Sequence, residues 1–344
     1  MSAQAATPSA ASAASATPPL ALLCGASGFI GRHIACALRA AGWQVRPASR
    51  RSAPAVDYTR ATHASDWQPL LQGASAVINA VGVLRDSRAR PMQALHADAP
   101  CALFEACAAS GVRRVIHISA LGIDGGPAAR TPYARTKRQA EERLLALTAQ
   151  GRLDGIALRP SLVFGAGGAS TRLFLALARL PVLALPRCAF TARVQPLAVW
   201  DLAEAVARLA ASPAASHAAS HAANARPLTG LLELAGPQPL TLAAYIQQLR
   251  ASQGRPPARA LALPACITRA SARLGDALPF SPWCTQSLHL LSAGNVASPA
   301  ALPELLGRPA TAPAQFMQAL AAAAQADAPG VRKPQNGRDE GGAP

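Results

Sequence analysis

Lysine and aromatic residues are scarce in this chain of 344 residues, although positive charge is not. Only Lys137 and Lys333 of its 33 Lys and Arg residues are lysines, and aromatic residues make up 4% of the chain. Proteins that bind single-stranded nucleic acids combine aromatic stacking platforms with clustered basic residues, whereas these arginines are spread along the whole sequence. The net charge of +16 therefore does not indicate nucleic-acid binding. It remains compatible with an anionic lipid surface or an acidic protein partner.

Paired cysteines and long apolar runs are also missing. The seven cysteines are scattered without a C-x-x-C pair, which is typical of reduced thiols and not of a disulfide framework or a zinc site. The most apolar stretch, residues 173–185, is interrupted by Arg179 and Pro181 and is too short to span a bilayer. Residues 2–19 lack the basic segment of a signal peptide. We therefore expect a cytoplasmic protein without a metal site.

Strand and helix patterns alternate from residue 20 to about residue 165. The predicted strands are 20–24, 43–48, 55–58, 74–80, 112–119 and 155–159, and the predicted helices are 29–41, 64–71, 92–110 and 132–149. This order is typical of an α/β fold with a doubly wound parallel sheet of the Rossmann type. We expect residues 20–165 to form a nucleotide-binding core of this kind.

The pattern changes after Pro160, and residues 166–326 are expected to form a smaller mixed C-terminal lobe interleaved with the core. Its predicted elements are helices at 170–180, 202–211 and 241–252, a strand at 230–235, and short helices over 260–322, with Asp201 as the cap of the second helix. The tails 1–19 and 327–344 and the insert 212–227 are of low complexity, which predicts disorder. The insert carries His217 and His221 without a third ligand nearby, so it indicates a surface insert and not a metal site.

Three glycines mark the junction between the first predicted strand and the first predicted helix. Gly25, Gly28 and Gly31 follow a G-x-x-G-x-x-G spacing. The first suits a tight turn, the second lets a pyrophosphate approach the backbone, and the third allows close helix packing. The free N–H groups at the helix N-terminus favour an anion there. The predicted cofactor contacts along this turn are Gly25, Ser27, Gly28, Phe29, Ile30 and Gly31.

The residues after the second predicted strand favour NADPH over NADH. A site for NADH usually places an acidic residue there, whereas this chain has Arg50 and Arg51 and no acid before Asp57. Guanidinium groups bind a 2′-phosphate well. Asp57 and Tyr58 are predicted to lie near the adenine. Two arginines carry little information in an arginine-rich chain, however, so NADH stays open as an alternative.

Tyr133 and Lys137 are four residues apart on a predicted helix and therefore share a face. A phenol ionises near pH ~10, and a neighbouring cation stabilises the phenolate and lowers that pKa. The chain has only three tyrosines and two lysines, which argues against a coincidental pairing. We predict Tyr133 as an acid/base group and Lys137 as the residue that tunes it. The alternative is an ordinary exposed helix face.

Ser119 ends the fifth predicted strand, at the edge where doubly wound sheets place their ligands. Its hydroxyl can hydrogen-bond a substrate carbonyl, which makes Ser119 a third candidate catalytic residue. It can equally satisfy backbone groups at the strand end.

These features together resemble the short-chain dehydrogenase/reductase superfamily, in its extended or atypical branch, and the NAD-dependent epimerase/dehydratase family within it. The resemblance covers roughly residues 20–325. It includes, besides the residues above, the segments 79–82, 158–165, 194–197, 234–237 and 293–296. Within the superfamily the chain looks similar to the group of the NADPH-binding accessory subunit of respiratory complex I.

The resemblance implies a Rossmann domain with a smaller C-terminal substrate lobe. It implies Tyr133 as the acid/base and Lys137 as the residue that orients the nicotinamide ribose. Further cofactor contacts are implied after two strands: Asn79, Ala80, Val81 and Gly82 after one, and Pro160 and Ser161, next to Arg159, after the other.

Two hypotheses follow. In the first, the chain is an NAD(P)H-dependent oxidoreductase, or an epimerase or dehydratase, that acts on a small organic substrate. In the second, it is a non-catalytic NADPH-binding accessory or assembly protein linked to a respiratory complex or to quinone metabolism, at the inner face of the membrane. Leu121, two positions after Ser119, supports the second, because extended members of the superfamily usually carry Ser or Thr there. The sequence carries no signal for the oligomeric state.

Overall fold

The computed structural model describes residues 17–212, 228–278 and 281–326. The insert with His217 and His221, and nearly all of the two predicted tails, lie outside these residues.

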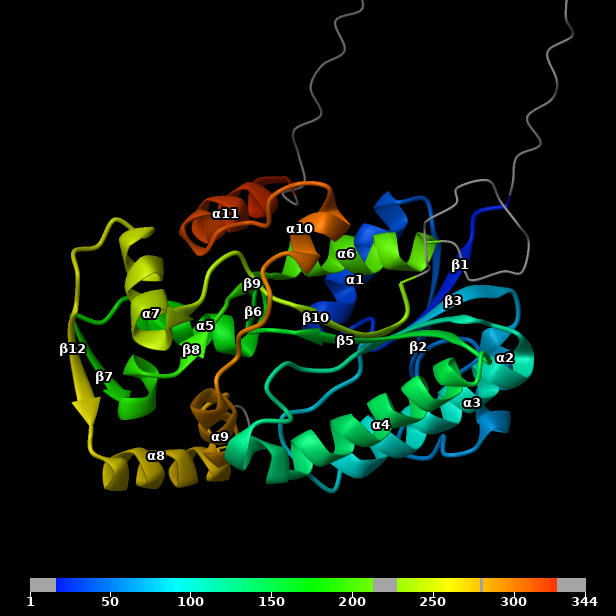
Figure 1. Cartoon of the computed structure of the whole chain (residues 1–344), viewed down its shortest axis with the longest axis horizontal. Helices are drawn as coiled ribbons and strands as arrows, with labels where there is room; N and C mark the ends of the chain where they lie inside the picture. Colours follow the sequence, from blue (N-terminus) through cyan, green and yellow to red (C-terminus); the bar gives the residue numbers. More distant parts are fainter. Residues whose placement is uncertain (1–16, 213–227, 279–280, 327–344) are drawn as a thin grey trace, which may run out of the picture.

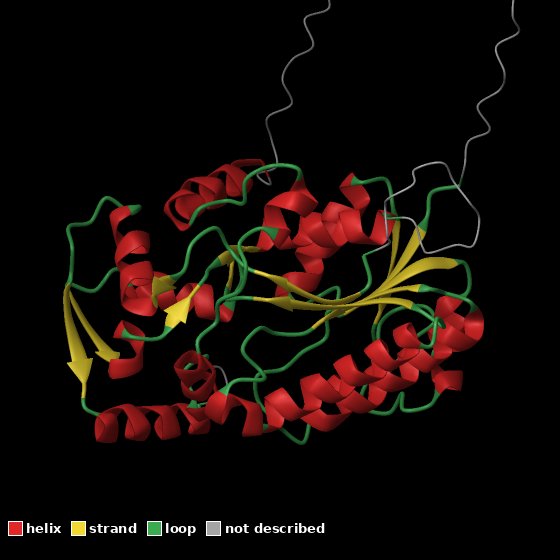
Figure 2. Ribbon diagram, viewed as in Figure 1, coloured by secondary structure: helices red, strands yellow, loops and turns green. Residues whose placement is uncertain are grey.

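A six-stranded sheet forms the centre of the core domain (Figures 1 and 2). Its strands are β1 (Leu20–Cys24), β2 (Gln44–Ala48), β3 (Ala74–Asn79), β4 (Arg114–Ile118), β5 (Asp154–Pro160) and β10 (Gly230–Leu234). They lie in the order β10-β5-β4-β3-β1-β2, and every pairing is parallel. The predicted Rossmann-type parallel sheet is thus confirmed.

Helices cover both faces of this sheet, as Figure 1 shows. On one face lie α1 (Phe29–Ala40), α6 (Val199–Ala211) and α10 (Ala301–Leu306), and on the other lie α2 (Gln68–Leu71), α3 (Ala99–Ser110) and α4 (Pro132–Ala149). Side chains of a strand alternate between the two faces, so Ala21 and Leu23 join the core under α1 and α6 while Leu22 and Cys24 join the core under α3. Burial on both faces explains why β1 is apolar throughout.

The C-terminal lobe packs small sheets and helices around a third apolar core. Its strand pairs are β6 (Val163–Phe164) with β9 (Leu197–Ala198), β7 (Val182–Pro186) with β12 (Arg259–Leu263), and β8 (Arg193–Val194) with β11 (Leu240–Thr241). Its helices are α5 (Ala169–Leu177), α7 (Leu242–Ala251), α8 (Ala265–Ala277), α9 (Thr285–Ala293) and α11 (Phe316–Ala326). Phe164 stacks on Phe316 at the centre, with ring centroids 4.7 Å apart. Since β10 returns to the large sheet, lobe and core alternate along the chain.

The strand predicted at 55–58 is wrong. The N–H of Val56 bonds back to the carbonyl of Ser49 (2.9 Å), and the carboxylate of Asp57 accepts from the N–H (3.0 Å) and hydroxyl (2.8 Å) of Thr59. These three bonds turn the chain, so β2 is left as the edge of the sheet. Its Pro47 suits an edge, because proline cannot donate to a further strand.

The helix predicted over 92–110 is confirmed in its bounds, but it includes the π-turn η2 (Ala94–Asp98), which leads into α3. One predicted helix start is wrong. Asp201 lies inside the first turn of α6 and is not its cap. Its buried carboxylate instead accepts from the N–H of Thr311 (2.7 Å) and from Arg308 (2.9 Å), which ties α6 to the chain after α10. Short 3-10 turns complete the fold: η1 (Ala64–Asp66), η3 (Gly126–Arg130), η4 (Arg187–Phe190) and η5 (Pro313–Gln315).

Candidate functional site

The glycine turn after β1 is closely packed. Gly25 has φ +79°, and a Cβ there would lie 2.9 Å from the carbonyl of Ala80, in the chain that follows β3. A Cβ on Gly31 would lie 2.0 Å from the carbonyl oxygen of Gly25, so this glycine packs against the turn itself and not, as expected, against the sheet. The N–H of Gly28 donates to the same oxygen (2.9 Å). Side chains at Gly25 or Gly31 would therefore open the turn.

The N-terminus of α1 leaves its backbone donors available. No side chain caps the helix, and its first turn carries no acidic residue. Ser27 and Gly28 are exposed, and Phe29 and Ile30 are partly exposed. An uncapped helix start with unsatisfied N–H groups favours an anion, so the turn fits the pyrophosphate of a dinucleotide.

Arg50 and Arg51 are exposed in the loop that follows β2. Strand β2 is the neighbour of β1, which leads into the glycine turn. Arg46, in β2 itself, is already bound to the carbonyls of Leu70 and Gln72 (both 2.7 Å). Hydrogen bonds from Thr59 hold the pKa of Asp57 below its ordinary value, and the positive charges of Arg50 and Arg60 add to this effect. Arg50 and Arg60 thus lie near a carboxylate that stays ionised.

Asn79 orders the chain after β3. Its Oδ1 accepts from the N–H of Val81 (3.2 Å) and the hydroxyl of Tyr58 (3.3 Å), and its Nδ2 donates to Nδ1 of His117 (3.1 Å). Tyr58, predicted near the adenine, lies in the core against Trp67, with ring centroids 4.9 Å apart. It therefore positions Asn79 from beneath the segment 79–82.

Lys137 projects from α4 to the carboxyl end of β4. Its buried Nζ donates to the carbonyls of Ile118 (2.9 Å) and Val81 (3.4 Å), and Gly82 leaves it room, since a Cβ there would lie 3.4 Å from Nζ. Burial lowers the pKa of Lys137 to about 8, although the charge of Glu141 opposes the shift. An ammonium has three donors, so one is left for a ligand.

Tyr133 lies one turn before Lys137, with its ring edge-on to His96 at a centroid distance of 5.4 Å. Its phenol oxygen makes no hydrogen bond with any residue that the structure describes. Burial, with a smaller effect of Glu141, raises the pKa of Tyr133 to about 12. We expected Lys137 to lower this pKa, but burial raises it, and the phenol stays protonated at neutral pH.

His96 is a residue of this site that the sequence did not reveal. Its Nε2 accepts from the N–H of Val83 (2.8 Å), and its Nδ1 lies 3.1 Å from the hydroxyl of Thr136, which donates to the carbonyl of Pro132 (2.9 Å). The proton of this ring is therefore on Nδ1. Burial and the charge of Lys137 lower the pKa of His96 to about 2, so it is neutral. A lone histidine in a helical pattern carries no signal for such a contact.

Ser119 lies directly after β4 and is buried. Its N–H donates to the carbonyl of Leu158 (2.7 Å), but its hydroxyl has no hydrogen-bond partner among the described residues. A buried polar atom without a partner calls for an explanation, and a bound ligand supplies one.

The residues after β5 are engaged with other parts of the chain. The hydroxyl of Ser161 donates to the carbonyl of Gln195, and the carbonyl of Pro160 accepts from Leu121 (3.0 Å). Arg159 is held by both carboxylate oxygens of Glu141 (2.9 and 2.5 Å) and by Asp124. The bond of Ser161 joins the core to the lobe, the others lie within the core, and the cofactor contacts of Pro160 and Ser161 stay predictions.

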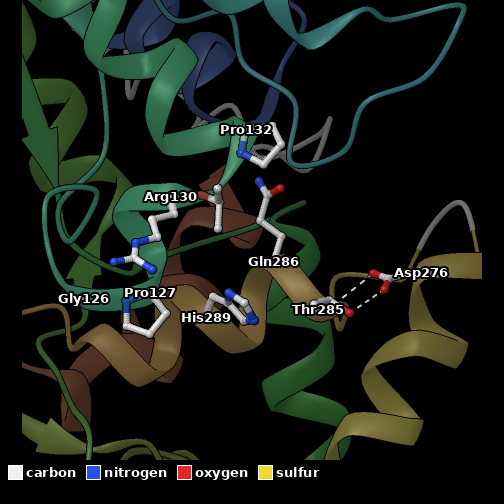
Figure 3. A pocket seen from close by; sticks show the side chains of 9 residues that line it. Gly126, Pro127, Arg130, Pro132, Asp276, Thr285, Gln286 and His289 are labelled. Atoms are coloured by element: carbon white, nitrogen blue, oxygen red, sulfur yellow. Dashed lines mark hydrogen bonds between the residues drawn. The ribbon is translucent and has the colours of Figure 1, made fainter.

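A cavity of about 810 Å³ opens where the core meets the lobe, at the N-terminal end of α4. Figure 3 shows side chains from η3, α4 and α9 around it, with Asp276 of α8 bound to Thr285 at one side (N–H to Oδ1, 2.9 Å). The lining is Gly126, Pro127, Arg130, Thr131, Pro132, Asp276, Thr285, Gln286 and His289. These residues come from distant segments, so sequence patterns could not group them.

Comparisons with known proteins agree with this geometry. The pattern of the NAD-dependent epimerase/dehydratase family matches residues 21–222. A ceramide reductase from Caulobacter vibrioides (strain NA1000 / CB15N) is 29% identical over 204 residues, which span 55% of this chain and only 60% of that protein.

Solved structures share the fold at low identity. MoeE5, in complex with UDP-glucuronic acid and NAD, is similar with a TM-score of 0.62 and 19% identity over 90% of this chain and 99% of that one. The NADPH-dependent quinone oxidoreductase QOR2 from Escherichia coli, complexed with NADPH, has a TM-score of 0.61 and 19% identity over 88% of this chain and 99% of that one.

Proposed function

The chain belongs to the NAD-dependent epimerase/dehydratase family, and from this membership we propose that it is an NADPH-dependent reductase of a carbonyl group in a lipid-like substrate. The observation that carries the proposal is the buried hydroxyl of Ser119, which has no partner among the described residues and follows Ile118, whose carbonyl accepts from the buried ammonium of Lys137. Both groups lie at the carboxyl end of β4, where doubly wound sheets bind their ligands, and Tyr133 lies one turn before Lys137 on α4.

We assign the parts of the cofactor to the glycine turn, to the loop after β2 and to Lys137. The backbone of Gly25–Gly31 would hold the pyrophosphate, since Cβ atoms would fill the turn. Arg50 and Arg51 would hold a 2′-phosphate, and the remaining donor of Lys137 would bind the nicotinamide ribose. When bound, this cofactor supplies the hydride for the carbonyl carbon of the substrate.

Tyr133 then acts as the acid. Its pKa of about 12 keeps the phenol protonated, which suits reduction, because the carbonyl oxygen must gain a proton as the carbon gains a hydride. Ser119 would donate a hydrogen bond to the same oxygen and stabilise its developing charge. Lys137 would stabilise the phenolate, which water reprotonates to complete the cycle.

Two observations support a lipid-like substrate. The Caulobacter vibrioides relative is a ceramide reductase, and a ceramide is a lipid with an amide and hydroxyl head. The cavity is lined by Pro132, the residue before Tyr133. It offers the polar groups of Arg130, Gln286 and His289, which can bind such a head.

The proposal is tested by assaying reduction of the ketone that corresponds to a ceramide oxidised at its secondary hydroxyl. We expect turnover with NADPH, and a loss of about 100- to 10,000-fold in kcat for Tyr133→Phe without loss of NADPH affinity. Tyr245→Phe is the matched control, because its buried hydroxyl also lacks a partner among the described residues and belongs to the core of the lobe. Unchanged turnover in Tyr133→Phe would refute the assigned role.

Cofactor choice has its own test. Replacing both Arg50 and Arg51 by alanine should weaken NADPH binding about 10- to 100-fold, because charged hydrogen bonds to the 2′-phosphate are lost, and should leave NADH binding unchanged. Arg60→Ala, an exposed arginine on the same loop, is the control. Equal losses for both nucleotides would contradict the assignment.

A non-catalytic NADPH-binding accessory protein is the second candidate. It is favoured by the engagement of Lys137, which already donates to two backbone carbonyls. Denaturing the purified protein and identifying the released nucleotide separates the two candidates. Stoichiometric, slowly exchanging NADPH without turnover would favour this accessory role. The role would then be linked to a respiratory complex or to quinone metabolism, as in the second hypothesis above.

A further inference from the structure

Helix α8 exposes its larger apolar side chains and buries its small ones. The buried positions are Thr268, Ala272 and Gly275, whereas Ile267 and Leu274 are 50% and 67% exposed. A helix on the surface of a globular protein normally shows the opposite pattern. The exposed side of α8 therefore has the character of an interface.

The exposed apolar residues form one stripe on this helix. Ile267 and Leu274 are seven residues apart, which places them on one side of a helix with 3.6 residues per turn. Cys266 and Ala270 are exposed and border this side. Leu278, the residue directly after the helix, is 53% exposed.

The apolar surface extends beyond α8 onto the small sheet of the lobe. Strand β12 leads into α8 through Pro264, and β7 pairs with it. In Figure 1 these three elements form one end of the molecule, far from β2. We call this the α8 end surface, and its exposed apolar residues are Leu180, Val182, Leu261, Ile267, Leu274 and Leu278.

Positive charge flanks this surface. Arg255, Arg259, Arg269 and Arg273 are exposed and make no ion pair within the described parts of the chain. Asp276 is the single acidic residue between Glu233 and Glu304, and its carboxylate is bound to Thr285. On α8 Arg269 and Arg273 are four residues apart and so share a side of the helix that is different from the side of Ile267 and Leu274.

We propose that the α8 end surface docks the protein on a bilayer that contains anionic phospholipid. Apolar side chains would enter the boundary between headgroups and acyl chains, and the arginines would contact the phosphates. None of the helices among the described residues has the length and hydropathy of a membrane span, so the contact is interfacial. Asp276 lies both on α8 and on the cavity wall, which places the cavity beside the docked surface.

The test uses purified full-length protein and flotation with two kinds of vesicle, phosphatidylcholine alone and phosphatidylcholine mixed with phosphatidylglycerol. We expect binding to the mixed vesicles and little to the neutral ones. Ile267→Ser with Leu274→Ser should weaken binding at least about 10-fold, through lost apolar burial. Removing one arginine should weaken vesicle binding roughly fivefold. Arg269→Glu with Arg273→Glu should weaken it by more than this per residue, because each change also adds a negative charge.

Matched controls change the same residue types elsewhere. Leu231→Ser on β10 and Arg39→Glu on α1 replace exposed residues outside the α8 end surface and should keep vesicle binding. Unchanged melting temperatures of all variants establish that each is folded.

Three outcomes would overturn the proposal. The first is a wild-type protein that does not bind anionic vesicles. The second is binding that the α8 variants leave unchanged, which would place the membrane contact elsewhere on the molecule. The third is a wild-type dimer that the variants convert to a monomer without affecting vesicle binding, because the surface would then join two copies of the chain. No substrate is needed, so the result is independent of the reductase assignment.

Discussion

At the scale of single residues, the site holds one buried ammonium close to two neutral histidines. Burial and the charge of Lys137 lower the pKa of both His96 and His117, and both rings are neutral. Burial also raises the pKa of Tyr133. Lys137 therefore stands as a cation next to neutral donors and acceptors, which suits a ligand with partial negative charge.

The burial of Lys137 predicts a pH-dependent stability. Its pKa is about 8 in the folded chain against an ordinary value of 10.5, so between these values the unfolded chain holds a proton that the folded chain has lost. The free energy of unfolding should therefore rise with pH across this window, by about 1.4 kcal/mol per pH unit at most. Below pH 8 this residue gives no slope.

Lys137→Met removes the titrating group and supplies the baseline. The difference in unfolding free energy between wild type and Lys137→Met should change in favour of wild type from pH 8 to pH 10.5. Denaturant titrations at several pH values measure it, with the cofactor absent. Parallel pH profiles for the two proteins would contradict the assigned burial.

At the scale of elements, α4 carries the site on one face. Tyr133, Lys137 and Glu141 are four residues apart, so they line one side of the helix. Tyr133 follows Pro132, which lines the cavity. Lys137 reaches the end of β4, and Glu141 binds Arg159 of β5. The Glu141–Arg159 pair thus fixes the helix on the sheet and, through it, the position of the two other residues.

Breaking this buried pair should destabilise the chain strongly. Glu141→Ala leaves the guanidinium of Arg159 buried without its main partner, and we expect a loss of about 3–5 kcal/mol in unfolding free energy. Glu142→Ala, the exposed neighbour on the same helix, should change stability by less than about 0.5 kcal/mol.

A double variant keeps this prediction specific. Glu141→Leu with Arg159→Met replaces the ion pair by apolar side chains and should recover most of the lost stability, because no charge is left unpaired. Chemical denaturation of the three variants measures all of these differences. A double variant as unstable as Glu141→Ala would mean that the pair itself is not what stabilises the contact.

At the scale of the whole molecule, the sequence predicts what local signals encode. The apolar run before Gly25 and the start of α4 at Pro132 follow from periodicity and turn residues, and the parallel sheet follows from their order. The contacts of His96, of Arg159 and of the cavity lining could not be predicted in this way, because each joins segments that are distant in the chain.

The failed strand at 55–58 shows the limit of pattern reading. Val56 and Tyr58 alternate with polar residues as in a half-buried strand, and both are buried. Hydrogen bonds to Ser49 and from Thr59 nevertheless turn the chain away from the sheet. The burial was predictable from this pattern, but the backbone pairing was not.

The loop after β2 closes on itself. The N–H of Ser49 donates to the hydroxyl of Ser52 (3.0 Å), which in turn donates back to the carbonyl of Ser49 (2.8 Å), and no strand depends on this loop. Arg50 and Arg51 can therefore be exchanged without disturbing the fold around them. If Arg50 and Arg51 bind the 2′-phosphate as we propose, a preference for NADPH or NADH could evolve by exchange of these two surface residues, without changes in the sheet.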